Sequence, residues 1–139
     1  ETNANSRLYI LGDGPLKNDL LKLIDELELQ NYVFLVGQVE NPFTVLKMCD
    51  CFVLSSHYEG QPMVLLEAMT LGMDILATDI IANRTVLENG KYGALVNNSV
   101  DGLVGGLNNF SNHTNPAYAP FNYKEYNKKA MDTFYKVLN

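Results

Sequence analysis

The sequence predicts an α/β fold in which a parallel sheet is flanked by helices. Five short segments are apolar and rich in β-branched and aromatic residues, as expected of strands buried on both faces. Segments with apolar residues at helical spacing alternate with them, and Gly, Pro or Asn residues mark most of the junctions. Because right-handed crossovers join successive parallel strands, this alternation indicates a Rossmann-like sheet with helices on both faces.

The expected strands are residues 7–11, 32–37, 51–56, 74–80 and 93–97. The first helix is expected to begin at Pro15, because the missing N–H of proline would have no partner at a first helical position. Apolar residues then recur on one face until the helix ends near Leu29, namely Leu16, Leu20, Leu23, Ile24 and Leu27. Asn41 as the cap and Pro42 in the first turn predict the next helix.

In the second half of the chain, a helix is expected over 62–71, with Gly72 as its stop signal. A short helical turn is expected over 83–89. Residues 98–110 predict a weak helix that is either frayed or closely packed, since each of its glycines costs about 1 kcal/mol relative to Ala. The last helix, about 123–138, is amphipathic, with Tyr126, Ala130, Phe134 and Val137 on one face.

Composition excludes several classes of protein. With 139 residues and 47% hydrophobic content, residues 1–139 have the size of a single domain. The net charge of -6 and the absence of a Lys/Arg cluster disfavour a nucleic-acid partner. No apolar run approaches the roughly 20 residues of a transmembrane helix, and no secretory leader is recognisable. These features predict a cytoplasmic protein without a transmembrane segment.

No metal site is expected. Cys49 and Cys51 have no second pair of ligands to complete a zinc site, and they are expected to be buried free thiols.

In an open parallel sheet, ligands bind beyond the carboxyl ends of the strands. Three loops that begin there are therefore candidates: Gly12 to Pro15, Gly37 to Pro42 and Ser55 to Pro62. The first loop resembles a dinucleotide-binding loop only in part, because Lys17 stands where the third glycine should be. A dinucleotide cofactor is therefore not expected.

The third loop leads into the stretch EGQPMVLLE, in which Glu59 and Glu67 lie on either side of a helix start. A helix N-terminus attracts phosphate through its amides and its dipole, and carboxylates accept hydrogen bonds from sugar hydroxyls. The pattern therefore favours a site for a nucleotide-sugar. The alternative is that both glutamates are ordinary solvated acids, and spacing alone does not separate these interpretations.

Several segments, taken in their order and spacing, resemble the C-terminal domain of the retaining GT-B glycosyltransferases of the group 1 type, the family with an E-x7-E motif. The resemblance runs from Leu8 to about Phe110 and includes the last helix. The segments that carry it are ILGDGP (10–15), VFLVG (33–37), SSHYEGQPMVLLEAMTLG (55–72), ILATD (75–79) and NGKYGALV (89–96).

The resemblance implies a role for each residue of the loop. Glu59 is the candidate catalytic residue and would contact hydroxyls of the donor hexose, while Glu67 would bind the ribose hydroxyls. The nucleotide base would lie near Gly37 and Gln38. The implied donor-binding residues are Gly37, Gln38, Glu59, Gly60, Gln61, Pro62, Met63 and Glu67. The donor would be a nucleotide-diphospho-sugar, with no metal and no further cofactor, and transfer of the hexosyl group would retain the anomeric configuration.

Departures from the family pattern leave the donor sugar and base open, notably Gln61, Asp74 and the residues 80–83. The family's first strand and helix of this domain, which carry an Arg and a Lys, would lie upstream of Glu1, as would the acceptor-binding domain. The chain is thus expected to be a donor-binding fragment that is inactive alone, from a protein whose peripheral membrane association is possible. The alternative is a non-catalytic interaction module with the same Rossmann-like fold.

Overall fold

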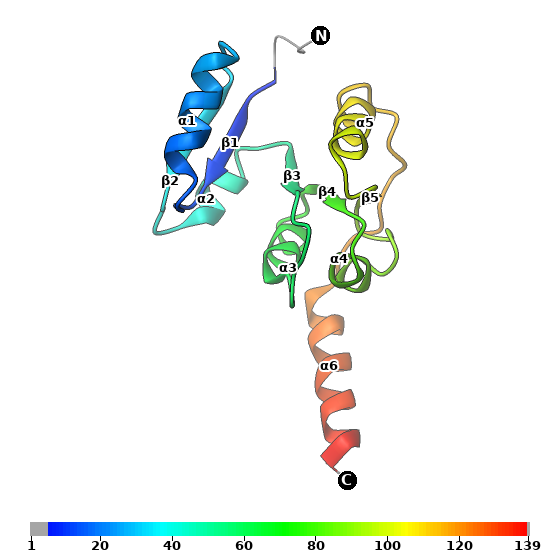
Figure 1. Ribbon diagram of the computed structural model, residues 1–139. Helices are drawn as coiled ribbons and strands as arrows, with labels where there is room; N and C mark the ends of the chain where they lie inside the picture. The colour runs from blue at the N-terminus through cyan, green and yellow to red at the C-terminus, as the bar shows by residue number, and fades with distance from the viewer. Residues whose placement is uncertain (1–5, 139) are drawn as a thin grey trace. The chain divides into compact units, whose positions relative to one another are not determined.

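A computed structural model describes residues 6–138 of the chain. The chain divides between Val45 and Leu46 into two compact units, which are coloured from blue to red along the chain in Figure 1. Every strand pairing is parallel, and helices separate successive strands. The predicted α/β class with parallel strands and flanking helices is therefore confirmed.

The first unit contains a two-stranded sheet. In order, its elements are β1 (Leu8–Leu11), α1 (Lys17–Glu26) and β2 (Val33–Gly37), with α2 (Pro42–Leu46) at its end. The helix expected from Pro15 begins two residues later, because residues 15 and 16 form a turn in which the Lys17 amide donates to the Gly14 carbonyl at 3.2 Å. The cap predicted for α2 is confirmed, since Asn41 Oδ1 accepts from the Phe43 amide at 3.1 Å.

The second unit contains a three-stranded sheet in the order β3-β4-β5. Its elements are β3 (Cys51–Leu54), α3 (Met63–Thr70), β4 (Asp74–Thr78), α4 (Ile81–Val86), β5 (Ala94–Val96), α5 (Val100–Ser111) and α6 (Tyr123–Leu138). The predicted stop of α3 is confirmed: Gly72 has φ +71°, and the Met73 amide donates to the Ala68 carbonyl at 3.1 Å.

The five expected strands are all present, two in the sheet of the first unit and three in the sheet of the second. Backbone hydrogen bonds join β1 to β2 in one sheet and β3 to β4 in the other. Within the sheet of its own unit, each of β1 and β3 is an edge strand. The strand alternation in the sequence predicts the parallel direction of pairing that both sheets show.

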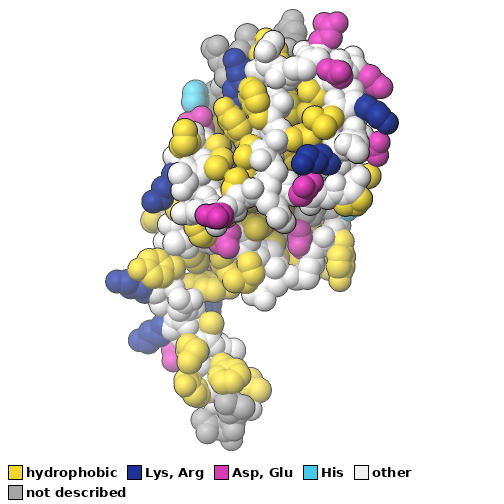
Figure 2. All heavy atoms as spheres, turned by 90° about the vertical axis from the view of Figure 1, so that its left-hand side faces the viewer, with side chains coloured by type: hydrophobic (Ala, Val, Ile, Leu, Met, Phe, Trp, Pro, Cys, Tyr) yellow, Lys and Arg dark blue, Asp and Glu magenta, His cyan; other side chains and the backbone are white. Residues whose placement is uncertain are grey.

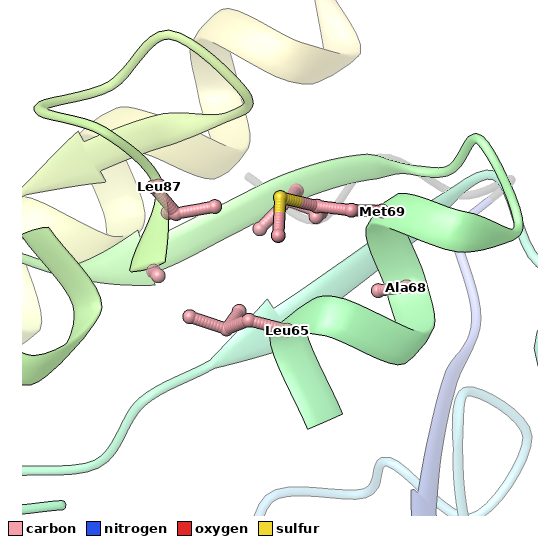
Figure 3. Close-up of a cluster of buried hydrophobic side chains, with 6 residues drawn as sticks. Leu65, Ala68, Met69 and Leu87 are labelled. Carbon is pink, nitrogen blue, oxygen red and sulfur yellow. The ribbon is translucent and has the colours of Figure 1, made fainter. Parts of the chain in front are cut away.

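The core of the second unit lies between α3 and β4. Figure 3 shows Leu65, Ala68 and Met69 on α3, with Leu87 beside them. Ile75 and Ala77 of β4 complete this buried cluster. Because β4 is buried over four of its five residues, it provides a fixed base for the loops at its carboxyl end.

Close packing also explains the glycines of α5. Gly106 is buried, and a Cβ built on it would lie 2.5 Å from Leu76 Cδ1 and 2.9 Å from Val96 Cγ1. Of the two expected alternatives, a frayed helix or a closely packed one, the structure shows close packing at Gly106.

The amphipathic helix expected near the C-terminus is present as α6, but much of its apolar face is exposed. Tyr126 packs against Phe121, with ring centroids 5.5 Å apart, whereas Phe134 is 57% exposed and Val137 82% exposed. Figure 2 shows exposed hydrophobic side chains among polar ones, including along this helix at the lower end of the view. In the described part of the chain, no helix is both long and apolar enough to cross a membrane.

Candidate functional site

The corner between β3 and α3 is built around Pro62. This residue is buried and precedes α3, which begins at Met63, one residue later than predicted. The Met63 amide donates to the Gln61 carbonyl at 2.9 Å, and the Leu65 amide donates to the Pro62 carbonyl at 3.0 Å. The free amides expected at this helix start are therefore fewer than predicted, because the tight turn engages these two.

The N-terminus of α3 nevertheless keeps its positive electrostatic end. No acidic side chain lies in its first turn, and no side chain caps it. Aligned peptide dipoles place roughly half a positive charge at such an end. The dipole is therefore not neutralised by the helix's own first turn and favours an anion near Pro62.

Glu59 is held in place by a neighbour in the same loop. Its side chain is half-buried, and the Ser56 Oγ donates a hydrogen bond to Glu59 Oε1 at 2.7 Å. A carboxylate accepts hydrogen bonds through both of its oxygens. One oxygen of Glu59 is thus oriented by Ser56, and the group retains the capacity to accept a hydroxyl of a ligand.

Glu67 is the fifth residue of α3 and is half-buried. It lies four residues after Met63, which is 53% exposed, so the two share a helix face. The opposite face is the one that packs into the core. Because long side chains in helices lean toward the N-terminus, we expect the Glu67 carboxylate to lie over the first turn of α3, which is the end with the positive dipole.

The remaining candidate residues divide between the two units. Gly60 and Gln61 are exposed in the loop before α3. Gly37 and Gln38 belong to the first unit, where Gly37 ends β2 with φ +76° and its carbonyl accepts from the Gly12 amide at 2.8 Å. Glu59 to Met63 and Glu67 thus lie in one loop and the helix that follows it, whereas Gly37 and Gln38 lie in the other unit, and the binding role of every one of these residues stays a prediction.

A buried polar network lies behind the Glu59 loop. The Thr78 Oγ1 donates to the Ser56 carbonyl at 2.5 Å. The Asn83 Nδ2 donates to the Thr78 carbonyl at 2.9 Å and contacts Thr78 Oγ1 at 3.3 Å. Thr78 and Asn83 are both 0% exposed. Sequence reasoning did not identify either residue as part of the site.

The serine of this network had a signal in the sequence. Ser56 and Glu59 are only three residues apart, a separation at which a hydroxyl and a carboxylate in one loop can meet. No comparable local pattern marks Thr78, because the pairing of β3 with β4 brings it to Ser56, and the contact of Asn83 with Thr78, five residues away, follows no pattern that we recognised in the sequence.

Two further polar pairs flank the corner. The His57 ring is exposed, and its Nδ1 lies 2.6 Å from Asn98 Oδ1. The Asp79 carboxylate, just after β4, accepts two hydrogen bonds from Arg84, at 2.8 and 2.7 Å. These hydrogen bonds hold the pKa of Asp79 below its usual range. Asp79 is thus engaged in an ion pair.

Comparisons with known proteins point to one family. The family profile described as "Glycosyl transferases group 1" matches residues 1–129. The chain is 49% identical over 79 residues to an uncharacterized glycosyltransferase of Methanocaldococcus jannaschii, an alignment that covers 57% of this chain and 20% of that protein. It is 32% identical over 105 residues to the UDP-Gal:alpha-D-GlcNAc-diphosphoundecaprenol alpha-1,3-galactosyltransferase of Escherichia coli, covering 74% of this chain and 27% of that protein.

A solved structure shows the same fold. The apo form of the lipopolysaccharide outer core galactosyltransferase WaaB matches with a TM-score of 0.66 and 30% sequence identity, over 74% of this chain and 30% of that one. The fold class is therefore that of one part of a GT-B glycosyltransferase. The chain spans less than a third of the length of each of these three proteins.

Proposed function

Because this chain belongs to the group 1 glycosyl transferases, we propose that it is the donor half of a retaining enzyme that transfers a hexosyl group from a nucleotide-diphospho-sugar. The observation that carries the proposal is the corner between β3 and α3. There Glu59, oriented by Ser56, and Glu67 lie on either side of a helix start whose dipole is not neutralised. This arrangement offers carboxylates for hydroxyls and a positive helix end for phosphate.

Glu59 and Glu67 have different tasks in this proposal. Glu59 accepts hydrogen bonds from hydroxyls of the donor hexose and is the candidate catalytic residue. Glu67 accepts hydrogen bonds from the ribose hydroxyls, and the two acids form the ends of an E-x7-E motif. The loop residues between them, Gly60, Gln61 and Pro62, together with Met63, approach the sugar and the diphosphate.

The donor class is supported by the name of one relative. The Escherichia coli galactosyltransferase, 32% identical over 105 residues, is named for the donor UDP-Gal. We extend only the class of donor to this chain, a nucleoside diphosphate that carries a sugar. Gly37 and Gln38 are the residues proposed to lie near its base.

The proposed chemistry is the stabilisation of charge on the departing diphosphate. Cleavage of the bond between sugar and phosphate places a growing negative charge on the leaving group, and stabilising such charge is normally the largest contribution to catalysis. The α3 dipole supplies part of that stabilisation. Glu59 orients the hexose so that the acceptor attacks on the face that retains the anomeric configuration.

The remainder of the machinery is proposed to come from other parts of the full-length protein. A strand and a helix that carry an Arg and a Lys would complete the C-terminal domain, and a separate N-terminal domain would bind the acceptor. In the part of the chain that the structure describes, β1 and β3 are each an edge strand of their own unit's sheet, and each edge offers a place for a parallel strand. We therefore expect the 139-residue chain alone to show no transfer activity.

For each base, the test compares the nucleoside diphosphate with its glucose conjugate, two ligands that differ only in the hexose. The affinity of the full-length protein is measured calorimetrically for UDP, GDP and ADP and for their glucose conjugates. We expect Glu67→Ala to weaken binding of both the diphosphate and the conjugate, and Glu59→Gln to weaken binding of the conjugate alone. The expected loss is roughly 10- to 100-fold, as for hydrogen bonds to charged groups.

Glu26→Gln, at the end of α1, is the matched control and should leave both affinities unchanged. Binding of neither ligand class by the full-length protein would contradict the proposal and favour an interaction module. Retention is tested separately, by the coupling constant of the anomeric proton in the NMR spectrum of the product. An inverted anomer would refute the retaining mechanism without removing the donor site.

A further inference from the structure

We propose that Thr78 and Asn83 are positioning residues that set the Glu59 carboxylate through Ser56, and that they thereby contribute to recognition of the sugar part of the donor. This inference rests on the proposed function of Glu59. All four residues belong to the second unit, so the network is internal to one compact body.

The donors and acceptors of the network point in one direction. A threonine hydroxyl has one proton, and Thr78 gives it to the Ser56 carbonyl. Thr78 Oγ1 can then only accept from Asn83, whose Nδ2 also donates to the Thr78 carbonyl. At the other end, the Ser56 hydroxyl donates to Glu59 Oε1. The Asn83 amide must therefore present its Nδ2 donor to Thr78. The series of hydrogen bonds ends at the Glu59 carboxylate, which only accepts.

Side-chain hydrogen bonds link the end of β4 to the loop after β3, beyond the last backbone pair of the two strands. Backbone pairing between β3 and β4 ends at Leu54 and Ala77, whereas β4 continues to pair with β5 as far as Thr78. Ser56 therefore lies beyond the last backbone pair of β3. The Thr78 side chain provides the next link from β4 to this loop, across 22 residues of sequence.

The burial of Asn83 indicates a role beyond stability. Its side chain is 0% exposed, and its Oδ1 accepts no hydrogen bond from the described residues. A buried polar atom left without a partner costs about 1–3 kcal/mol, and such atoms in native structures call for an explanation. The Nδ2 group of this amide donates to Thr78, and the Thr78 hydroxyl in turn donates to the Ser56 carbonyl.

The consequence for the site is a fixed loop. Ser56 is anchored through its carbonyl to β4 while its hydroxyl binds Glu59. Loss of the anchor would allow the serine and the bound acid to move together. Precise placement matters at a site that recognises hydroxyls, because a displaced carboxylate loses hydrogen bonds that depend on distance and angle.

The experiment uses the full-length protein and three Thr variants. Thr78→Val keeps the shape of the side chain and removes the hydroxyl, while Thr78→Ser keeps the hydroxyl. Thr70→Val is the control, because the Thr70 hydroxyl is exposed and donates only to the Leu66 carbonyl within its own helix. For each variant, affinity is measured for the nucleoside diphosphate and for its glucose conjugate, using the base that the wild-type protein binds.

We expect Thr78→Val to bind the conjugate about 3- to 10-fold more weakly, the effect of one ordinary hydrogen bond, while its affinity for the diphosphate stays at the wild-type value. Thr78→Ser should recover most of the lost affinity, and Thr70→Val should match the wild type. Asn83→Ala, at the far end of the network, provides a second variant with the same expected selectivity.

Three results from the Thr78 variants would overturn the inference and leave the proposed function standing. Equal weakening of both ligands by Thr78→Val would indicate a merely structural role, and unchanged binding of both would show that the network does not reach the sugar. Selective weakening that Thr78→Ser fails to reverse would assign the effect to packing. A wild-type protein that binds neither ligand would instead refute the proposed function, and this inference with it.

Discussion

The Oγ of Ser56 donates a hydrogen bond of 2.7 Å to Oε1 of Glu59, within the loop that leads into α3. Both side chains are half-buried, so the bond is partly shielded from competition with water. It determines which way one of the two candidate glutamates faces. The spacing of the two glutamates identifies Glu59 as a candidate, but it does not identify Ser56, the residue that positions Glu59.

We predict that Ser56→Ala weakens binding of the nucleotide-sugar by about 3- to 10-fold, because one hydrogen bond that orients Glu59 is lost. Affinity for the nucleoside diphosphate should stay unchanged, since Glu59 is proposed to contact only the sugar. Calorimetric titration of both ligands measures the difference. Ser111→Ala, an exposed serine at the end of α5, is the control. Parallel loss of both affinities would argue against the proposed division of tasks.

Local signals predicted most of the elements. The Asn41-Pro42 cap of α2 and the Gly72 stop of α3 depend on residues within one or two turns, and both are confirmed by their hydrogen bonds. The start of α1 was predicted at Pro15 and lies at Lys17. Pro fits either a turn or a first helical position, so its local preference alone does not decide between them.

The contact of Thr78 with Ser56 could not be predicted because it depends on long-range pairing, although the contact of Asn83 with Thr78 spans only five residues. Thr78 contacts a carbonyl 22 residues away, and only the register of β3 on β4 brings the two together. The corner with Glu59 and Glu67 was identifiable because its chemistry lies within nine consecutive residues.

The ion pair of Asp79 with Arg84 predicts a pH dependence of stability. Hydrogen bonds from Arg84 lower the pKa of Asp79 in the folded protein, so the pair stabilises the fold above the unfolded-state pKa of about 3.9. This contribution is lost as the pH falls through the lower folded-state pKa. The effect should be small, because the side chains of Asp79 and Arg84 remain 33% and 50% exposed.

Thermal unfolding of wild type and Asp79→Asn at a series of pH values tests this. The wild type should be the more stable at pH 7, and the difference should shrink below about pH 4 and in high salt. Asp132→Asn, on the exposed surface of α6, serves as the comparison. A difference between wild type and Asp79→Asn that persists at the lowest pH would show that the ion pair is not its cause.

Cys51 is predicted to be a slow nucleophile. It is a free thiol that is half-buried, whereas full burial was expected. Burial is the larger cause and the nearby Asp74 carboxylate the smaller one that together raise the pKa of Cys51 to about 11. Only the thiolate reacts, so at pH 8 roughly one thiol in a thousand is reactive.

Labelling with iodoacetamide, followed by mass spectrometry, should show Cys51 reacting far more slowly than a free cysteine. Asp74→Asn should accelerate it modestly, and unfolding in urea should remove the protection. Modification in the native chain at the rate of free cysteine would contradict the shifted pKa.

Two adjacent glycines of α5 should respond oppositely to the same substitution. Ala gains about 1 kcal/mol over Gly in a helix, and a Cβ at Gly105 would meet nothing within 4 Å. At Gly106 it would lie 2.5 Å from Leu76 Cδ1, and Leu76 is only 1% exposed, so it has little room to move aside. Overpacking of this kind costs about 1–3 kcal/mol.

Urea unfolding followed by circular dichroism should therefore show a higher midpoint for Gly105→Ala and a lower one for Gly106→Ala. Because helix propensity is the same at both positions, equal stabilisation by the two variants would mean that α5 does not pack against β4 as closely as the structure indicates.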